Sequence, residues 1–276
     1  VVFACVIAIA DSVATAPIVV MEDTGNGEMQ PAPDSELQLL LDRPNPMMDQ
    51  AEFFQTVASM AALSGFCVIE HERNGLGKTV ALWPLRSDWV RPVPRDQSPP
   101  AWEYRVPGRR DPFILEPEDV TVHTHAPDPN MGYTGTSPMA IAFRELGIEN
   151  AMTDYLKAFF DHGAMPQLGL KTTKNFQTQE EADAFRERVV GKYAGLKNSA
   201  DPMLLQGVDD VKRLGFNFDE LAFPELRKLT ETNICTAFRV PPILIGIQAG
   251  LDASTYSNYG QARKAFYEFH ASLMEP

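Results

Sequence analysis

The sequence predicts an α+β fold in which long amphipathic helices accompany an irregular antiparallel sheet. Residues 138–162 and 223–238 carry apolar side chains at helical spacing, whereas residues 66–122 alternate with a period of two. Prolines interrupt the later strands of this middle stretch, which favours an antiparallel sheet over a buried parallel one. No Gly-rich phosphate loop occurs in the sequence, so a nucleotide-binding fold is not indicated.

The first 20 residues are apolar enough to raise the question of a membrane span or signal peptide. They begin without Met or a basic leader, carry Asp11 and Ser12 in their middle, and meet Pro17 before a bilayer-spanning length. We therefore expect a buried helix, and a chain whose true N-terminus lies upstream.

The next segments are short. Residues 22–34 are rich in Gly, Pro and acids and predict a surface loop. Residues 35–41 predict a short helix that ends before Pro44. Asp49 with Glu52 predicts a capping box for a helix that runs to Gly65.

Period-two patterning then predicts strands at 66–72, 79–85, 89–93, 102–106 and 119–122. Asn74-Gly75 indicates a hairpin between the first two. Ser137-Pro138 predicts the start of the longest helix, with serine as N-cap and proline at the first helical position. This helix runs to residues 162–163, and about 25 residues give a rod of roughly 37 Å.

A small α/β insert is expected after the long helix, with strands at 167–172, 203–205 and 211–214 and a helix at 178–194. A second long helix spans 223–238 and ends at Pro241-Pro242. Its apolar stripe includes Leu226 and Leu229. A loop of small residues at 246–254 and a last helix at 256–273 follow.

The composition argues against a protein that coats nucleic acid, because 24 basic against 37 acidic residues give a net charge of -13. Cys5, Cys67 and Cys235 lie far apart without metal-ligand or CxxC spacing. A disulfide framework, a structural metal and a cofactor are therefore not indicated, and a reducing cytoplasm fits the cysteine usage.

Short sequence motifs distributed along the chain resemble those of the siphophage-type portal proteins of tailed phages. They lie at residues 3–5, 9–14, 41–46, 52–53, 132–138, 159–164, 239–246, 256–258 and 266–267. Residues 132–138 are similar to the family's Gly-x-Ser-Pro entry to its long helix. Residues 239–246 are similar to the family's Val-Pro-Pro-x-x-Leu-Gly motif, but this chain has one extra residue within it. Pro224 departs from the family pattern, which has a helix former there.

The resemblance implies the portal fold: a wing with an irregular antiparallel sheet, two long stem helices and a small α/β clip. It assigns residues 1–137 to the wing, 138–162 to the first stem helix, 163–217 to the clip, 218–239 to the second stem helix, 240–257 to the tunnel-loop region and 258–276 to a helix that returns to the wing. The family's C-terminal crown and extreme N-terminus are not present in this sequence.

The implied function is structural and not enzymatic: a ring of about twelve copies at one capsid vertex through which double-stranded DNA is packaged and ejected without sequence specificity. Implied partners are the terminase large subunit, then the head-tail adaptor, and the major capsid protein, with no membrane. The implied location is the virion, after synthesis in the bacterial host cytoplasm.

The resemblance also places a tunnel loop at residues 246–254. Its members are Gly246, Ile247, Gln248, Ala249, Gly250, Leu251, Asp252, Ala253 and Ser254. The polar face of the second stem helix supplies the candidates for the channel wall, which are Glu225, Lys228 and Glu231.

Three alternatives remain open. A metal or proton-transfer enzyme is suggested by His123, His125 and Asp128, although no further ligand recurs at ligand spacing. A peripheral membrane module would use residues 1–20, which lack the basic side chains that such binding needs. A monomeric helical protein would hide both helical stripes internally, and the sequence does not separate it from a ring.

Overall fold

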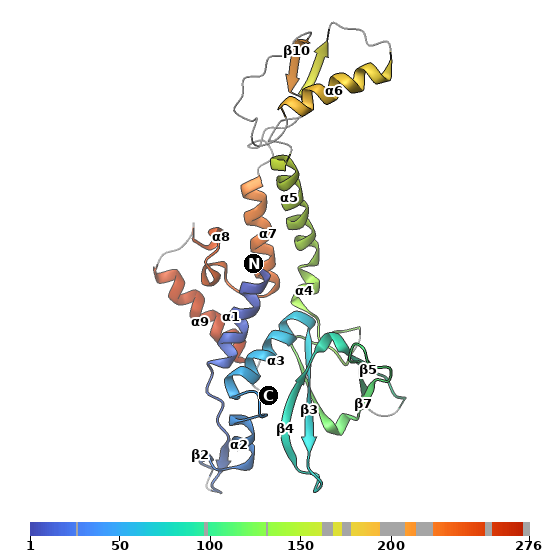
Figure 1. Ribbon diagram of the computed structural model, residues 1–276. Helices are drawn as coiled ribbons and strands as arrows, with labels where there is room; N and C mark the ends of the chain where they lie inside the picture. Colours follow the sequence, from blue (N-terminus) through green and yellow to red (C-terminus); the bar gives the residue numbers. More distant parts are fainter. Residues whose placement is uncertain are drawn as a thin grey trace. The chain divides into compact units, whose positions relative to one another are not determined.

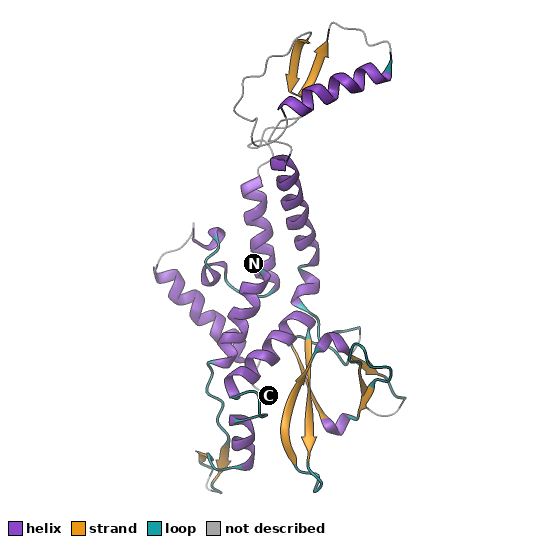
Figure 2. Ribbon diagram, in the orientation of Figure 1, coloured by secondary structure: helices purple, strands orange, loops and turns teal. Residues whose placement is uncertain are grey.

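The computed structural model describes the whole chain except residues 26, 97–98, 131, 162–167, 173–177, 194–207, 214–222, 252–255 and 273–276. It contains two compact units, one of residues 1–143 and 231–276 and one of residues 144–230 (Figure 1). Helices and small antiparallel sheets occupy separate segments (Figure 2), which confirms the predicted α+β class.

Helix α1 (Val2–Ala14) is a core element of the first unit. Its buried side includes Cys5, Val6 and Ile9, and it packs against α3. The buried Ser12 hydroxyl donates to the Ile9 carbonyl over 2.7 Å, so it carries no unsatisfied donor. Among the described residues, no helix is both long and apolar enough to cross a membrane.

The segment that follows differs from the predicted loop. Strands β1 (Met21–Asp23) and β2 (Met29–Pro31) pair as an antiparallel ribbon in which every residue is exposed. Turn residues such as Gly25, with φ of 83°, were visible in the sequence, but three-residue strands carry too little alternation to detect. The predicted helix at 35–41 is confirmed as α2 (Glu36–Asp42), capped by Ser35.

Helix α3 (Gln50–Ser64) begins and ends as its sequence predicts. Asp49 and Glu52 form a complete capping box, and Gly65 closes the helix in the left-handed conformation with φ of 88°. Phe53 and Val57 on the buried face pack with Cys67 of the neighbouring strand. This contact fixes the helix on the sheet.

Two three-stranded antiparallel sheets complete this part of the first unit. One has the order β4-β3-β8, with β3 (Phe66–Arg73) between β4 (Thr79–Leu85) and β8 (Val120–Thr124). The other has the order β5-β6-β7, with β5 (Val90–Val93), β6 (Ala101–Tyr104) and β7 (Phe113–Leu115). Strand β7 was not predicted from the sequence. The short helices η1 (Ser87–Trp89) and η2 (Pro117–Asp119) directly precede β5 and β8.

The two sheets share one core. Phe66 of β3 and Trp102 of β6 are buried with their ring centroids 5.8 Å apart, and Val68, Leu85 and Val90 complete the cluster. Burial of such side chains contributes about 1.5–3 kcal/mol each. The apolar residues that alternate along these strands therefore point into one shared core.

A close approach of two glycines joins the end of α3 to the start of the next helix. A side chain at Gly65 would overlap the Gly135 carbonyl, and one at Gly135 would overlap the Gly65 carbonyl. Ser137 then caps α4 (Pro138–Ile141) and donates its hydroxyl to the Leu63 carbonyl over 2.5 Å. The predicted Ser-Pro helix start is confirmed.

The single helix predicted over 138–162 is instead two. Ala142 has ψ of 0°, which departs from helical geometry and separates α4 from α5 (Phe143–Asp161). From Arg144 onward, α5 belongs to the second unit. Neither glycine nor proline marks position 142, so no residue signal predicts the interruption.

The insert of the second unit contains β9 (Leu168–Thr172), α6 (Gln179–Tyr193) and β10 (Val208–Arg213). The two strands pair antiparallel, with an irregularity between Val208 and Asp210. These elements confirm the predicted strand–helix–strand order, while the strand predicted at 203–205 lies outside the described residues.

Helix α7 (Phe223–Ala237) begins in the second unit and ends in the first. Pro224 lies in its first turn, where the missing backbone N–H removes no helical hydrogen bond, so the helix starts as predicted. After it come η5 (Pro242–Ile245), α8 (Gln248–Leu251) and α9 (Tyr256–Ser272). Both α1 and η5 contact α9, whose Phe266 is buried.

Candidate functional site

The candidate site starts where α7 ends, at a left-handed arginine. Arg239 has φ of 55°, and it is the only residue other than glycine with positive φ in the described part of the chain. Its N–H donates to the Thr236 carbonyl over 3.1 Å, and the Val240 N–H donates to the Cys235 carbonyl over 3.0 Å. This pair of bonds is a Schellman motif, in which glycine is the usual left-handed residue.

The two prolines after this cap set the next turn. Pro241 has φ of -58° and ψ of 128°, and the Leu244 N–H donates to the Pro241 carbonyl over 2.9 Å, which closes η5. Gly246 then ends η5 with φ of 70°. The prediction that Pro241-Pro242 terminates α7 is therefore refined, because the Schellman motif ends α7 before the prolines begin a new turn.

The predicted tunnel loop is partly helical. Ile247 precedes α8, which contains Gln248, Ala249, Gly250 and Leu251, and its carbonyl accepts the N–H groups of Gly250 and Leu251 at 3.0 and 3.2 Å. The expectation of a plain loop is wrong here. Asp252, Ala253 and Ser254 lie outside the described residues.

Glycine at position 250 explains how α8 packs against η5. A Cβ there would overlap the backbone of Ile243 and Pro242, so only glycine lets α8 lie directly on η5. Leu251, in contrast, is exposed. The segment therefore presents an anchored start followed by an exposed apolar side chain.

The three channel-wall candidates lie along α7 at intervals of three residues. Glu225 in the first turn is exposed, and Lys228 and Glu231 are half-buried. Glu225 and Lys228 belong to the second unit, whereas Glu231 and residues 240–251 belong to the first. Each unit therefore contributes part of the polar face predicted from the sequence.

An ion pair that the sequence did not single out ties α7 to α5 within the second unit. Arg227 Nε lies 3.3 Å from Glu149 Oε1. The other oxygen of Glu149 is buried without a hydrogen-bond partner among the described atoms. No local signal predicts this pair, because it depends on which faces of the two helices meet.

Part of the apolar face of each of these helices is exposed. Leu226 and Leu229 of α7 and Ile148 and Tyr155 of α5 are exposed, whereas Met152 is buried. Contiguous exposed apolar surface is typical of interaction sites. The predicted stripe is confirmed in position but is only partly used within one chain.

The metal-site alternative gains no support from the geometry. Among the described residues, no three His, Cys, Asp or Glu side chains are grouped as metal ligands. Burial lowers the pKa of His123, the backbone N–H of His125 donates to the Gly65 carbonyl over 2.8 Å, and the Asp128 carboxylate accepts the Asn130 N–H. The cluster forms part of the strand end and the turn beyond it.

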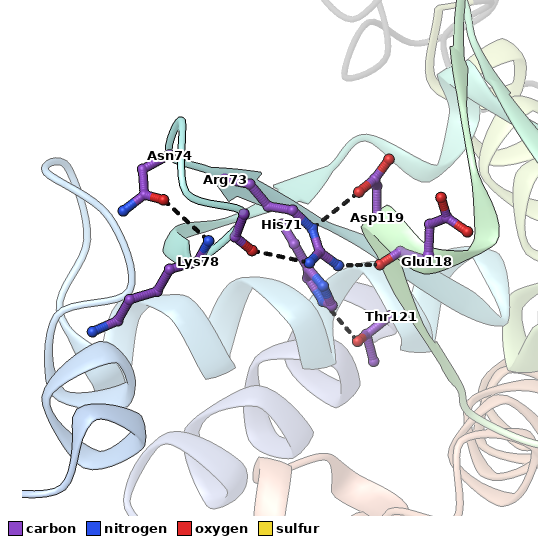
Figure 3. A network of polar contacts seen from close by, with 8 residues as sticks. His71, Arg73, Asn74, Lys78, Glu118, Asp119 and Thr121 are labelled. Atoms are coloured by element: carbon purple, nitrogen blue, oxygen red, sulfur yellow. Dashed lines mark hydrogen bonds and ion pairs between the residues drawn. The ribbon is translucent and has the colours of Figure 1, made fainter.

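A polar network at the C-terminal end of β3 was also not predicted from the sequence. Arg73 donates to the Asp119 carboxylate at 3.1 Å and to the carbonyls of Glu118 and Gly77 (Figure 3). His71 Nε2 lies 2.8 Å from the Thr121 hydroxyl, and burial, with the nearby Arg73 charge, lowers the pKa of His71. These contacts join the β3–β4 hairpin to β8 and hold it in place.

The fold described above is that of a known family. The profile of the family "Phage portal protein" matches residues 1–271. The chain belongs to the phage portal protein family.

Relatives extend over most of the chain. It is 25% identical over 273 residues to an uncharacterized protein of Rickettsia bellii (strain RML369-C), which covers 97% of this chain and 69% of that protein. It is also 25% identical over 257 residues to the portal protein of Enterobacteria phage HK97, which covers 89% of this chain and 57% of that protein.

Solved structures give the same fold. A chain of the neck of a native gene transfer agent particle, computed with C12 symmetry, superposes with a TM-score of 0.66 at 28% identity, covering 96% of this chain and 71% of that one. An HK97-family phage portal protein from Corynebacterium diphtheriae superposes with a TM-score of 0.56 at 14% identity, covering 94% and 79%, and shows the fold alone.

Proposed function

We propose that this chain is the portal subunit of a virion, that about twelve copies close into a ring, and that DNA enters and leaves the capsid through that ring. The observation that carries the proposal is the family match over residues 1–271, combined with the likeness to a neck chain in a particle of C12 symmetry. The role of the protein is structural, and the catalytic chemistry of packaging belongs to its partners.

The exposed stripes on α5 and α7 support ring formation. A closed ring needs heterologous contacts, in which one patch of a subunit meets a different patch of its neighbour. Leu226 and Leu229 offer apolar surface of the kind such contacts bury. A monomer would leave this surface in water.

The partners follow the family's division of labour. Residues 163–217 form the clip that meets the terminase large subunit during packaging and the head-tail adaptor afterwards. Residues 1–137 form the wing beside the major capsid protein, residues 138–162 and 218–239 form the stem, and residues 258–276 return to the wing. Residues 240–257 form the tunnel-loop region.

The decisive experiment is imaging of the purified full-length protein. We expect closed rings with head-to-tail contacts in cryo-electron micrographs and a matching mass by native mass spectrometry. Strictly monomeric behaviour at high concentration, or a twofold dimer with self-complementary faces, contradicts the proposal.

The segment 246–254 faces the DNA in this proposal. Deletion of residues 248–253 is expected to leave ring assembly intact and to lower packaging or retention of the genome, measured as DNA per particle. Because Gly250 packs on η5, a milder variant, Leu251→Ala, tests the exposed side chain alone. Leu76→Ala, at the exposed β3–β4 turn, is the control, and normal genome filling by both segment variants would count against the assignment.

The channel repels DNA weakly instead of gripping it. Duplex DNA carries one negative charge per ~1.7 Å, so a passage of roughly 37 Å holds about 20 phosphates. A basic wall would trap them by counterion release, whereas a chain of net charge -13 avoids this. Glu225, Lys228 and Glu231, two acids to one base, are the proposed wall residues.

Binding of assembled rings to duplex DNA across a salt series tests this point. We expect weak binding with a shallow dependence on salt concentration. Sub-micromolar affinity at physiological salt, together with a steep negative slope, would show a DNA-gripping protein.

A further inference from the structure

A row of aromatic and arginine side chains runs along one end of the β5-β6-β7 sheet. The Arg86 guanidinium lies 4.3 Å from the centre of the Trp89 ring, and the Arg109 guanidinium lies 4.1 Å from that of Phe113. Between them, the centroid of the Tyr104 ring lies 6.1 Å from that of Trp89 and 6.4 Å from that of Phe113. These five side chains form one continuous aromatic–arginine row, in which Phe113 and both arginines are exposed.

The positive charge at this end of the sheet is only partly neutralised. Arg86 pairs with Asp88 at 2.7 Å, whereas Arg109 and its neighbour Arg110 have no carboxylate partner within ion-pair distance among the described residues. Aromatic and arginine side chains are enriched at protein interfaces. The row therefore has the composition of a contact surface, and its charge favours an acidic partner.

The β1–β2 ribbon has the complementary composition. Its register places Met21 opposite Pro31, and Met29 lies two positions before Pro31, so these three side chains share one face. Every residue of both strands is exposed. Residues 21–34 carry four acids, and the first 42 residues of the sequence contain no Lys or Arg. Two-stranded ribbons are only marginally stable in water by themselves, so a partner on this face would stabilise it.

The base of the ribbon is fixed to α2. The amide oxygen of the buried Gln38 accepts the Val20 N–H at 2.7 Å, and the Ala32 N–H donates to the Val20 carbonyl at 2.9 Å. Helix α2 in turn contacts β4. Within the first unit, the ribbon and the β5-β6-β7 sheet lie on opposite sides of β4 and β3 (Figure 1). The ribbon of one chain therefore does not meet the row of the same chain.

We propose that the ribbon face made by Met21, Met29 and Pro31 docks on the aromatic–arginine row of a second copy of this chain. The inference rests on the proposed function, because the second copy is the neighbour in the ring. Thioether and proline groups pack favourably on aromatic rings, and the acids of the ribbon neutralise Arg109 and Arg110. Since the two surfaces differ, the contact is heterologous, as a closed ring requires.

Photo-crosslinking of the purified full-length protein tests the contact. Benzoylphenylalanine replaces Phe113 in unlabelled chains, which are assembled together with isotope-labelled wild-type chains, irradiated and digested. We expect crosslinks from position 113 to labelled peptides that contain residues 21–34, because labelled peptides come only from another copy. The same probe in place of Leu63, which is exposed at the end of α3, is the control and should not label that segment.

Charge reversal tests the electrostatic part of the contact. Arg109→Glu with Arg110→Glu, or Glu22→Lys with Glu28→Lys, should raise the protein concentration needed for half-assembly about tenfold or more, because like charges then face each other. Combining all four substitutions should restore assembly. Arg43→Glu, at an exposed position outside both surfaces, controls for the added negative charge. Circular dichroism confirms that each variant is folded.

The outcomes separate this interface from the ring itself. Rings that form equally well with either pair of charges reversed, or crosslinks from position 113 to other segments only, overturn the interface and leave the proposed function standing. Wild-type chains that stay monomeric overturn both.

Discussion

The two ends of α7 show opposite uses of one amphipathic pattern. Near its start, Leu226 and Leu229 are 40% and 58% exposed, whereas Ile234 and Phe238 at its end are 1% and 0% exposed. Leu226, Leu229 and Ile234 belong to the apolar stripe predicted from the sequence, whereas Phe238 lies one residue beyond the helix and outside that stripe. Periodicity therefore predicts which face is apolar, and the tertiary structure decides how much of that face the chain itself covers.

This difference in burial suggests that the start and the end of α7 have different roles. The end of α7 carries Ile234 and Cys235, which are buried within the chain, and it leads directly into the Arg239 cap. The start of α7 has one ion pair to α5 and uncovered leucines. Variants at the two ends should accordingly affect different properties of the protein.

The largest expected effect is the loss of ring assembly in the double variant Leu226→Glu, Leu229→Glu. Both side chains are exposed in a single chain, so the monomer should keep its fold, while two charges would enter the interface between neighbours. Native mass spectrometry measures the ring fraction, and circular dichroism confirms the fold. Leu76→Glu, at a position 93% exposed on the β3–β4 turn, is the control, and an unchanged ring fraction in the double variant refutes the role given to the start of α7.

At the other end, Phe238→Ala should destabilise the monomer by about 3–5 kcal/mol, because it leaves a cavity at a fully buried site. Leu229→Ala is the matched comparison and should change the free energy of unfolding by no more than about 0.5 kcal/mol. Urea denaturation measures both. Equal effects at the two positions would remove the distinction between the ends of the helix.

A smaller effect is expected at Gly250, where alanine would overlap the backbone of η5. The variant Gly250→Ala should lose about 1–3 kcal/mol or release α8 from η5. Gly260→Ala in α9, where no atom lies within 4 Å of the added carbon, should instead gain about 0.5–1 kcal/mol. A Gly250→Ala protein as stable as wild type would show that α8 is not anchored in solution.

The smallest effect is expected at Arg239. Glycine adopts positive φ without the strain of a side chain, so Arg239→Gly should raise stability by about 1 kcal/mol. Arg239→Ala removes the same side chain but keeps the strain, so the difference between the two variants isolates the backbone contribution. If alanine and glycine give the same thermal midpoint, the left-handed cap is not maintained.

Local signals explain which elements could be predicted. The capping box of Asp49 and Glu52 and the Ser137-Pro138 start depend on residues within one turn, and both are confirmed. The strands β1, β2 and β7 have three residues each and show no usable alternation. Length alone explains these misses.

Less of the candidate site than of the fold could be predicted from the sequence. Its position followed from the resemblance of residues 239–246 to a family word, and its assignment to the DNA tunnel stays a prediction. The packing of Gly250 on η5 depends on segments that meet only after folding. No spacing rule in one sequence contains that information.

The contact between Gly65 and Gly135 has a consequence for how this protein tolerates mutation. Because main chain meets main chain there, no change in a neighbouring side chain can make room for even one methyl group at either position. In a saturation-mutagenesis experiment, both positions should reject every substitution, and no second-site suppressor should arise among nearby side chains. The junction that leads into α4 would thus stay fixed while the surrounding surface diverges.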